Sequence, residues 1–171
     1  MPRFHLTPTR KAAVAAMACG LFAAAGPAAA ATFTWASGDF VPGTTAPSPL
    51  LASDVLSIQT SAAKSFSAVS FVNAGTVNWT GSSGNIGFIS GANVVNSGLW
   101  DAQGSATLSY GGGAASTFIN NGTLRKSGGT GITLIGDLTA LNIVNSGTVD
   151  AQTGTIVFGG SNIFNAGTVF T

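Results

Sequence analysis

The chain has 171 residues, of which 45% are hydrophobic and only 6% are charged, and its formal net charge is +1. This length fits one domain. The six Lys and Arg residues form no basic stripe that would displace counterions from phosphate, so the composition excludes a nucleic-acid binder.

The N-terminal segment has the three parts of an export signal. An apolar stretch at residues 12–25 is followed by small residues at 28–31, which suit a signal peptidase. A positively charged region precedes the apolar stretch and consists of Arg3, Arg10 and Lys11. We therefore predict that residues 1–31 are a signal peptide, cleaved before Thr32, and that the protein is exported to the cell surface or the medium.

Two other interpretations of this segment remain open. An uncleaved membrane anchor is disfavoured because the apolar stretch is short and is interrupted by Gly20 and by Gly26-Pro27. Lipidation at Cys19 would require a better lipobox than Ala-Met-Ala-Cys-Gly provides. We expect no membrane span in the mature chain.

Beyond the signal, the residue types restrict the chemistry. Three cations and five aspartates leave a formal charge of −2 after residue 31, where no Glu, His or Cys remains. Without His and Cys, the usual general bases, thiol nucleophiles and zinc ligands are absent. This excludes most hydrolytic triads and dyads and the zinc sites, and we expect no cofactor and no metal.

Residues 32–53 contain three prolines and no copy of the repeat described next. Their large apolar residues are Trp35, Phe40, Leu50 and Leu51. We predict that this segment is an N-terminal cap, because a stack of coils needs a cover over its open end. In residues 54–60, DVLSIQT, Leu56 and Ile58 alternate with polar residues, as expected for a first strand.

A single pattern recurs through residues 71–171: two apolar residues, Asn, a small residue, Gly, usually Thr, and an apolar residue. Its five copies are FVNAGTV, VVNSGLW, FINNGTL, IVNSGTV and IFNAGTV. Successive Asn residues are 23, 24, 25 and 20 positions apart, a period typical of solenoids. We predict an all-β fold, a right-handed parallel β-helix of about five coils of 20–25 residues over residues 54–171.

Apolar residues recur at fixed places relative to each Asn. Two positions before it stand Phe71, Val94, Phe118, Ile143 and Ile163. Four positions after it stand Val77, Trp100, Leu124, Val149 and Val169. A second alternating strand carries Ile86 with Phe88, Leu108 with Tyr110, Ile132 with Leu134, and Ile156 with Phe158. We expect each set to stack on an inward face, because alternation at period two puts such residues on one side of a strand.

The Asn and Gly of each copy have predicted structural roles. Asn tolerates a left-handed turn, and its amide can bond the Asn of the next coil at about 4.8 Å per step. This predicts a ladder of Asn73, Asn96, Asn120, Asn145 and Asn165. Gly accepts the positive φ of a sharp corner. This predicts corners at Gly75, Gly98, Gly122, Gly147 and Gly167.

The alternative fold is a sandwich of β-hairpins, because Asn-Gly pairs also favour tight turns. Only Asn121-Gly122 is a true Asn-Gly dipeptide, and the nearly constant period favours the solenoid.

These repeats carry a family resemblance. Copies of the form FxNxGTV, with Gly- and Thr-rich strands between them, resemble the repeats of exported bacterial β-helix proteins: autotransporter passengers, filamentous-haemagglutinin-like adhesins and PEP-CTERM-type repeat proteins. The resemblance covers residues 71–171 well and residues 54–70 weakly. It implies a structural or adhesive protein of the bacterial cell surface or extracellular matrix, with no catalytic activity. Because the sequence stops inside a repeat, we expect it to be part of a longer chain or to pair at its open coil by end-to-end self-association.

One column of the predicted stack carries charge. Five positions after each Asn stand Asn78, Asp101, Arg125, Asp150 and Phe170. Stacking in register would place the two carboxylates about 9 to 10 Å apart, two coil steps, on either side of Arg125. This is near the separation used by inverting glycosidases. We favour a surface ladder in which Arg125 neutralises both acids.

Binding or cleavage of a polysaccharide by this column is the alternative function. Trp79, after the first corner, is a further candidate, as an aromatic platform for sugar rings. The expected partners are therefore an extracellular polysaccharide or a host or matrix surface.

Two further motifs are incomplete. Residues 128–135, GGTGITLI, resemble a calcium-binding nonapeptide, but Thr133 stands where the Asp ligand belongs. Ser61 and Lys64 match the Ser-x-x-Lys of acyl enzymes, which requires a helix, whereas they lie among predicted strands.

Overall fold

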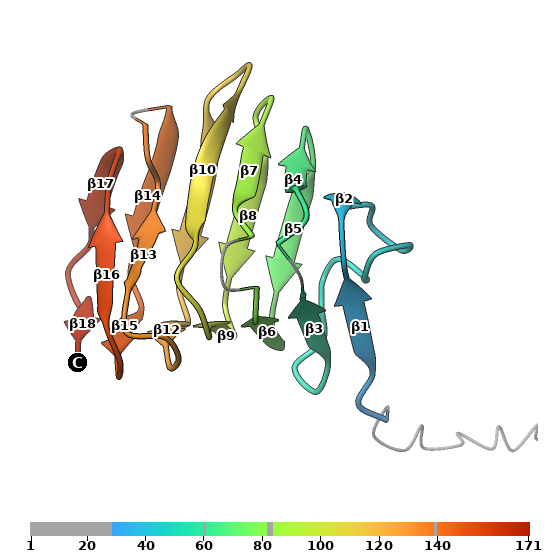
Figure 1. The fold of residues 1–171 in the computed structure, drawn as a ribbon, viewed down its shortest axis with the longest axis horizontal. Helices are drawn as coiled ribbons and strands as arrows, with labels where there is room; N and C mark the ends of the chain where they lie inside the picture. Colours follow the sequence, from blue (N-terminus) through green and yellow to red (C-terminus); the bar gives the residue numbers. More distant parts are fainter. Residues whose placement is uncertain (1–28, 60, 82–83, 139) are drawn as a thin grey trace, which may run out of the picture.

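The computed structural model describes residues 29–59, 61–81, 84–138 and 140–171. Apart from residues 29–31, the predicted signal peptide lies outside the described residues, as does Cys19. The described residues contain 18 strands and no helix, and they form a parallel β-solenoid of about six turns (Figure 1). Among them, no helix has the length and hydropathy needed to cross a membrane.

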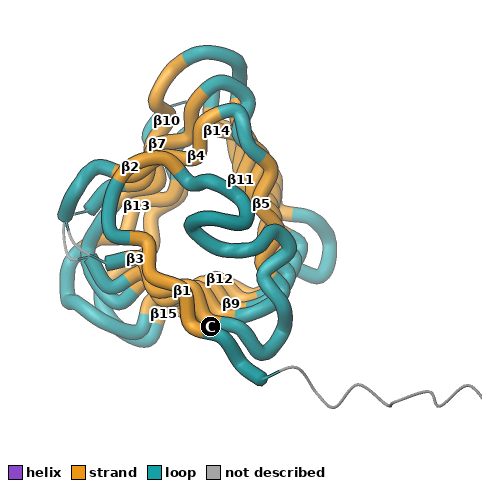
Figure 2. The backbone as a smooth tube through the Cα atoms, turned by 90° about the vertical axis from the view of Figure 1, so that its right-hand side faces the viewer, coloured by secondary structure: helices purple, strands orange, loops and turns teal. Residues whose placement is uncertain are grey.

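Three parallel sheets form the faces of the solenoid, and they enclose a triangular core when viewed along its axis (Figure 2). Sheet 1 has seven strands in the order β1-β3-β6-β9-β12-β15-β18. They are β1 (Thr32–Trp35), β3 (Val55–Ile58), β6 (Thr76–Trp79), β9 (Leu99–Ala102), β12 (Thr123–Lys126), β15 (Thr148–Ala151) and β18 (Val169–Phe170).

The other two faces repeat the same stacking. Sheet 2 has six strands: β2 (Gly38–Asp39), β4 (Lys64–Ser67), β7 (Ile86–Ile89), β10 (Thr107–Gly112), β13 (Ile132–Ile135) and β16 (Thr155–Phe158). Sheet 3 has five strands: β5 (Ser70–Asn73), β8 (Asn93–Asn96), β11 (Ser116–Asn120), β14 (Leu141–Asn145) and β17 (Ser161–Phe164).

Every strand pair in the described residues is parallel and joins strands of successive coils. A sandwich of hairpins requires antiparallel neighbours. The sandwich alternative is therefore wrong, and the predicted parallel solenoid is confirmed.

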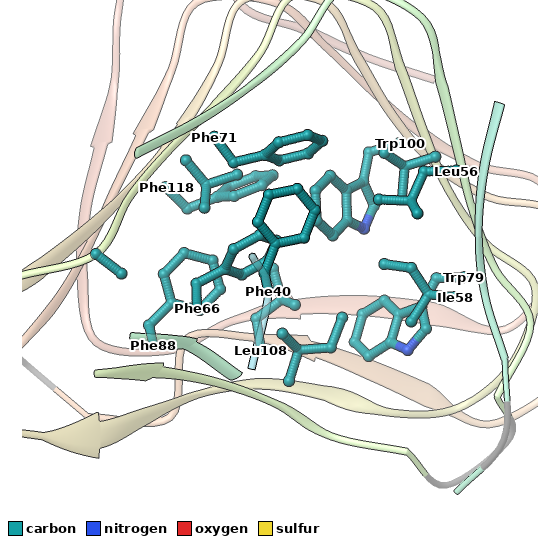
Figure 3. Close-up of a cluster of buried hydrophobic side chains, with 14 of the residues drawn as sticks. Phe40, Leu56, Ile58, Phe66, Phe71, Trp79, Phe88, Trp100, Leu108 and Phe118 are labelled. Atoms are coloured by element: carbon teal, nitrogen blue, oxygen red, sulfur yellow. The ribbon is translucent and has the colours of Figure 1, made fainter. Parts of the chain in front are cut away.

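The core is a column of aromatic and aliphatic side chains inside the triangle (Figure 3). Ring centroids of Phe66 lie 5.6 Å from Phe71 and 5.4 Å from Phe88, and those of Trp100 and Phe118 are 5.3 Å apart. These rings are all buried. Burying one such side chain contributes about 1.5–3 kcal/mol, so apolar packing stabilises a chain that has few charges.

The inward face of β13 differs from the prediction. Ile132 is 57% exposed, while Thr133 and Ile135 are buried. The register explains this, because Ile135 lies opposite Leu108 of β10 and Phe158 of β16. The inward residues of β13 are therefore shifted by one position from the expected pair, Ile132 and Leu134.

At the N-terminal end, the first coil begins earlier than residue 54. β1 pairs in register with β3, and β2 pairs with β4, which adds a turn to the expected five. The loop between β2 and β3 then crosses the end of the triangle (Figure 2). Its residues Phe40, Ala46 and Leu50 are at most 3% exposed, so this loop covers the core.

Candidate functional site

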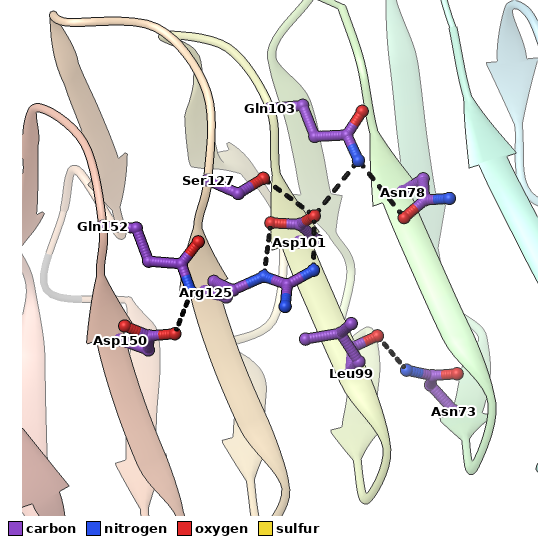
Figure 4. Close-up of polar contacts among 9 residues, drawn as sticks. All are labelled: Asn73, Asn78, Leu99, Asp101, Gln103, Arg125, Ser127, Asp150 and Gln152. Atoms are coloured by element: carbon purple, nitrogen blue, oxygen red, sulfur yellow. Dashed lines mark hydrogen bonds and ion pairs between the residues drawn. The ribbon is translucent and has the colours of Figure 1, made fainter. Parts of the chain in front are cut away.

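The predicted charged column exists, and Asp101 and Arg125 form an ion pair in it (Figure 4). Asn78, Asp101, Arg125 and Asp150 lie opposite one another in successive strands of sheet 1. The Arg125 Nε donates to Asp101 Oδ1 at 3.1 Å, and its Nη2 donates to Oδ2 at 2.9 Å. The Asp101 side chain is 2% exposed and that of Arg125 is 30% exposed, so the guanidinium covers the carboxylate.

Two neutral side chains complete the bonds to Asp101. Ser127 Oγ donates to Asp101 Oδ2 at 2.9 Å, and Gln103 Nε2 donates to the same oxygen at 3.1 Å. Asp150 is held differently, because it accepts hydrogen bonds from Gln152 at 2.8 Å and from Thr171 at 3.3 Å. Arg125 thus stacks between Asp101 and Asp150, but its bidentate bond is to Asp101.

The pKa of Asp101 is shifted in the opposite direction from that of a general acid. Burial by itself raises the pKa of Asp101, but hydrogen bonds from Arg125, Gln103 and Ser127 and the charge of Arg125 outweigh it, so the pKa lies below its ordinary value of 3.8. A glycosidase acid needs a raised pKa. Asp101 is therefore held as a carboxylate.

This shift predicts a pH-dependent contribution to stability. Since the pKa of Asp101 is lower in the folded than in the unfolded chain, its contribution is complete above pH 3.8 and is lost as the pH falls through the folded pKa. We expect Asp101→Asn to lower the unfolding free energy by about 2 kcal/mol at neutral pH, and the difference from wild type to shrink in acid. Urea unfolding, followed by circular dichroism from neutral pH to below pH 3.8, measures the loss of stability and its dependence on pH. A difference that stays constant to the lowest pH would contradict the prediction.

Four of the five repeat Asn residues form a buried ladder on the inner side of sheet 3. Asn73, Asn96 and Asn120 each donate from Nδ2 to Oδ1 of the next Asn, at 2.7, 2.7 and 2.6 Å, the last to Asn145. The same amides also donate to the carbonyl oxygens of Leu99, Thr123 and Thr148. All four side chains are at most 1% exposed, so the ladder joins sheet 3 to sheet 1 inside the core.

Asn165 is not part of this ladder, which corrects the prediction. Asn145 lies opposite Phe164, and the exposed Asn165 donates instead to Ser146 Oγ at 2.8 Å. Phe170 is displaced by one position in the opposite direction, since it lies opposite Val149 and not Asp150. The loops of the last coil differ in length from those of the coil before it. Only residues 159–160 separate β16 from β17, whereas residues 136–140 separate β13 from β14; residues 165–168 separate β17 from β18, whereas residues 146–147 separate β14 from β15.

The repeat Gly residues have a different role from the one predicted. Among these five Gly residues only Gly167 has a positive φ, and none of the five repeat Asn residues has one. The other four are needed for space: a Cβ on Gly98 would lie 2.1 Å from the Gly75 carbonyl oxygen, and one on Gly147 would lie 2.0 Å from that of Gly122. The corners therefore require Gly because the backbones of successive coils touch there.

Trp79 cannot serve as the predicted sugar platform, because it is 1% exposed. It follows Val77 by two positions and so occupies an inward place in β6, where its Nε1 donates to Gly84 O at 3.1 Å. Thr133, in the calcium-like motif, also points inward and donates to Gly104 O at 2.9 Å.

Two lysines are buried, which the sequence analysis did not predict. Lys126 is 0% exposed and donates from Nζ to Gly104 O and Gly128 O, both at 2.8 Å. Lys64 is 4% exposed and donates to Ala62 O at 2.9 Å. Burial lowers the pKa of both amines. The sequence signal for this burial is the period-two alternation of the strands, because each lysine occupies an inward position of its strand.

The outer side of sheet 3 is a second feature that the sequence analysis missed. Two columns of side chains run along it, and neither contains a charge. One is polar: Ser70, Asn93, Thr117, Asn142 and Ser161. The other is β-branched and aliphatic: Val72, Val95, Ile119, Val144 and Ile163. We call these ten residues the uncharged face.

Comparison with protein-family models, curated proteins and solved structures gives no match. The residues that the structure describes also enclose no pocket and no cluster of acidic, His or Cys side chains that could hold a metal ion. The candidate sites are therefore surfaces: the uncharged face of sheet 3 and the Asp101–Arg125 pair of sheet 1.

Proposed function

We propose that the protein is an exported structural or adhesive protein of the bacterial cell surface or extracellular matrix, which acts as a rigid β-solenoid without catalysis. The parallel coils and the buried Asn ladder support rigidity, because each coil is joined to the next by backbone and side-chain hydrogen bonds. The export signal and the resemblance of the repeats support the location.

The observation that carries the adhesive role is the uncharged face. Its two columns repeat at about 4.8 Å per coil, with about 6.6 Å between the columns along each strand. Hydroxyl and amide groups in one column can bond the hydroxyl rim of a sugar, while the methyl groups of the other can pack on its C–H groups. An extended neutral polysaccharide offers both kinds of group in a repeat, so it is the partner that this face fits.

The second candidate is an acidic polysaccharide bound by sheet 1. The observation that favours it is the position of Arg125, which remains 30% exposed while it pairs with Asp101. A partly exposed guanidinium can bond a sugar carboxylate. Cleavage is not proposed, because Asp101 is held as a carboxylate and its oxygens are occupied by Arg125, Ser127 and Gln103.

One binding experiment tests both candidates. The probes are crystalline cellulose, which is neutral, and immobilised alginate, which is acidic. Ile119→Lys puts a charge in the middle of the uncharged face, and we expect it to weaken retention on cellulose at least about tenfold, or about 1.4 kcal/mol. The matched control is Leu138→Lys, because Leu138 is 55% exposed but lies outside the face, and it should bind like the wild type.

The Arg125→Ala variant separates the two surfaces. If the uncharged face is the binding surface, Arg125→Ala binds cellulose like the wild type, and no variant is retained on alginate. Loss of alginate binding in Arg125→Ala, with circular dichroism unchanged, would instead support the second candidate. Equal cellulose retention by Ile119→Lys and the wild type, or no retention of either, would overturn the adhesive role assigned to the uncharged face.

A further inference from the structure

Two cleavage sites fit the end of the predicted signal peptide. A signal peptidase cleaves after a pattern of small residues such as Ala-x-Ala. Residues 28–31 are four alanines, so cleavage after Ala30 and cleavage after Ala31 both satisfy this pattern. The sequence is therefore compatible with a mature chain that begins at Ala31 as well as with the predicted start at Thr32.

Ala31 belongs to the folded part of the chain, although β1 begins one residue later. Val55 N donates to Ala31 O at 2.8 Å, which continues the hydrogen bonding between β1 and β3. Ala31 is half-buried, whereas Ala29 and Ala30 are exposed. Removal of the chain up to Ala30 therefore leaves the first coil intact, whereas removal of Ala31 takes away a bond between β1 and β3.

The backbone nitrogen of Ala31 contacts a buried carboxylate. Asp54 is 5% exposed, and its Oδ1 accepts a hydrogen bond from Ala31 N at 3.0 Å. Its Oδ2 accepts a hydrogen bond from Leu51 N at 3.3 Å, and its backbone carbonyl oxygen accepts one from Thr76 N at 2.9 Å. Asp54 thus joins the start of β1, the loop between β2 and β3, and the next coil.

This carboxylate lacks a partner of opposite charge. Among the described residues, no cationic side chain forms an ion pair with Asp54. Burying a charge is costly unless the charge is paired. Of the two nitrogens that donate to its carboxylate oxygens, that of Leu51 is always an amide, whereas that of Ala31 becomes an ammonium group when the chain begins there. A start at Ala31 supplies the missing positive charge at this position.

We propose that the signal peptide is cleaved before Ala31 and that the new α-ammonium group pairs with Asp54. Signal peptidase hydrolyses the bond between Ala30 and Ala31: water adds, Ala30 ends in a carboxylate, and Ala31 N becomes an ammonium group. Its hydrogen bond to Asp54 is then charged at both ends and is stronger than the bond from the precursor's amide. Cleavage thereby stabilises the first coil. The inference rests on the export that is part of the proposed function.

Processing of the full chain tests the position of cleavage. All 171 residues are expressed in a bacterial host, and the exported protein is analysed by intact mass and N-terminal sequencing. We expect the sequence Ala-Thr-Phe-Thr, which begins at Ala31. An exported chain that begins at Thr32, or at any other residue, would overturn the proposal but not the export. A chain that is neither exported nor cleaved would overturn both.

Acetylation of the exported protein tests the ion pair. The amines of a chain that begins at Ala31 are the α-amino group and those of Lys64 and Lys126, and both lysines are buried. Brief acetylation of the folded protein therefore modifies the α-amino group, and mass spectrometry confirms a single acetyl group. The product keeps the N–H of Ala31 but loses the charge. In urea unfolding we expect its unfolding equilibrium constant to be about tenfold larger than that of the unmodified protein.

Asp54→Asn should abolish this difference, because it removes the partner charge and keeps the size of the side chain. The matched control is Asp137→Asn, since Asp137 is an exposed aspartate in the loop after β13, and acetylation should affect it as it affects the wild type. An acetylation effect of equal size in Asp54→Asn and the wild type would overturn the ion pair. Equal stability of the acetylated and unmodified wild type would also overturn it, and that comparison does not require Asp54→Asn to fold.

Discussion

Gly122→Ala is expected to destabilise the solenoid by about 3 kcal/mol, because the added methyl group has no room. A Cβ at this position would lie 2.2 Å from the carbonyl oxygen of Gly98 and 2.7 Å from the carbonyl carbon of Ser97. Both are backbone atoms of the preceding coil, so the clash is relieved only if two coils separate at a corner. Chemical unfolding monitored by circular dichroism measures the loss.

The control for this substitution is Gly87→Ala in β7. A Cβ there would meet its nearest atoms at 3.7 Å, which is ordinary van der Waals contact, and Gly87 has no positive φ. Gly within a strand costs conformational entropy, so this variant should equal the wild type or exceed it by about 0.5 kcal/mol. If both variants lost the same stability, the close approach of the coils would not be the reason for Gly122.

Asn120→Ala is expected to cost about 3 kcal/mol or more, because it breaks the buried ladder in its middle. The change removes the bonds between Asn120 and Asn96 and between Asn120 and Asn145, and the bond from Asn120 to Thr148 O. The groups left behind are buried, and each unsatisfied group costs about 1–3 kcal/mol. The unfolding free energy and the hydrogen-exchange protection of β11 and β14 should both fall.

Asn165→Ala is the control for this substitution, because Asn165 is the repeat Asn that lies outside the ladder. Asn165 is exposed and bonds only to Ser146 among the described side chains, so its loss should cost no more than about 0.5 kcal/mol. A cost equal to that of Asn120→Ala would mean that the repeat Asn acts through its own turn and not through the ladder.

These two contrasts concern the Gly and Asn of the repeat, for which the pattern predicted a ladder that four of the five Asn residues form and a positive φ that only one of the five Gly residues has. The constant Asn-x-Gly spacing was enough to predict a parallel solenoid and to align Asn78, Asp101, Arg125 and Asp150 in one column. The reason is that successive coils pair backbone to backbone, so residues with the same place in the repeat become neighbours.

The sequence was less informative where the loops differ in length. The final coil is shorter than the one before it between β16 and β17 and longer between β17 and β18, and Asn165 and Phe170 each lie one position out of the column expected for them, in opposite directions. The Gly-rich turn before β13 likewise places Thr133 inward in place of Ile132. A repeat pattern counts residues, whereas register depends on the path that the loop takes through space.

The sequence by itself therefore established the strand repeat, the order of the columns and the scarcity of charge, because these follow from period and composition. Only the tertiary structure showed that Trp79, Lys64 and Lys126 lie inside, and that the uncharged face lies on the outer side of sheet 3. Burial depends on which side of a closed triangle a strand position faces, and that direction is decided when three sheets pack around one core.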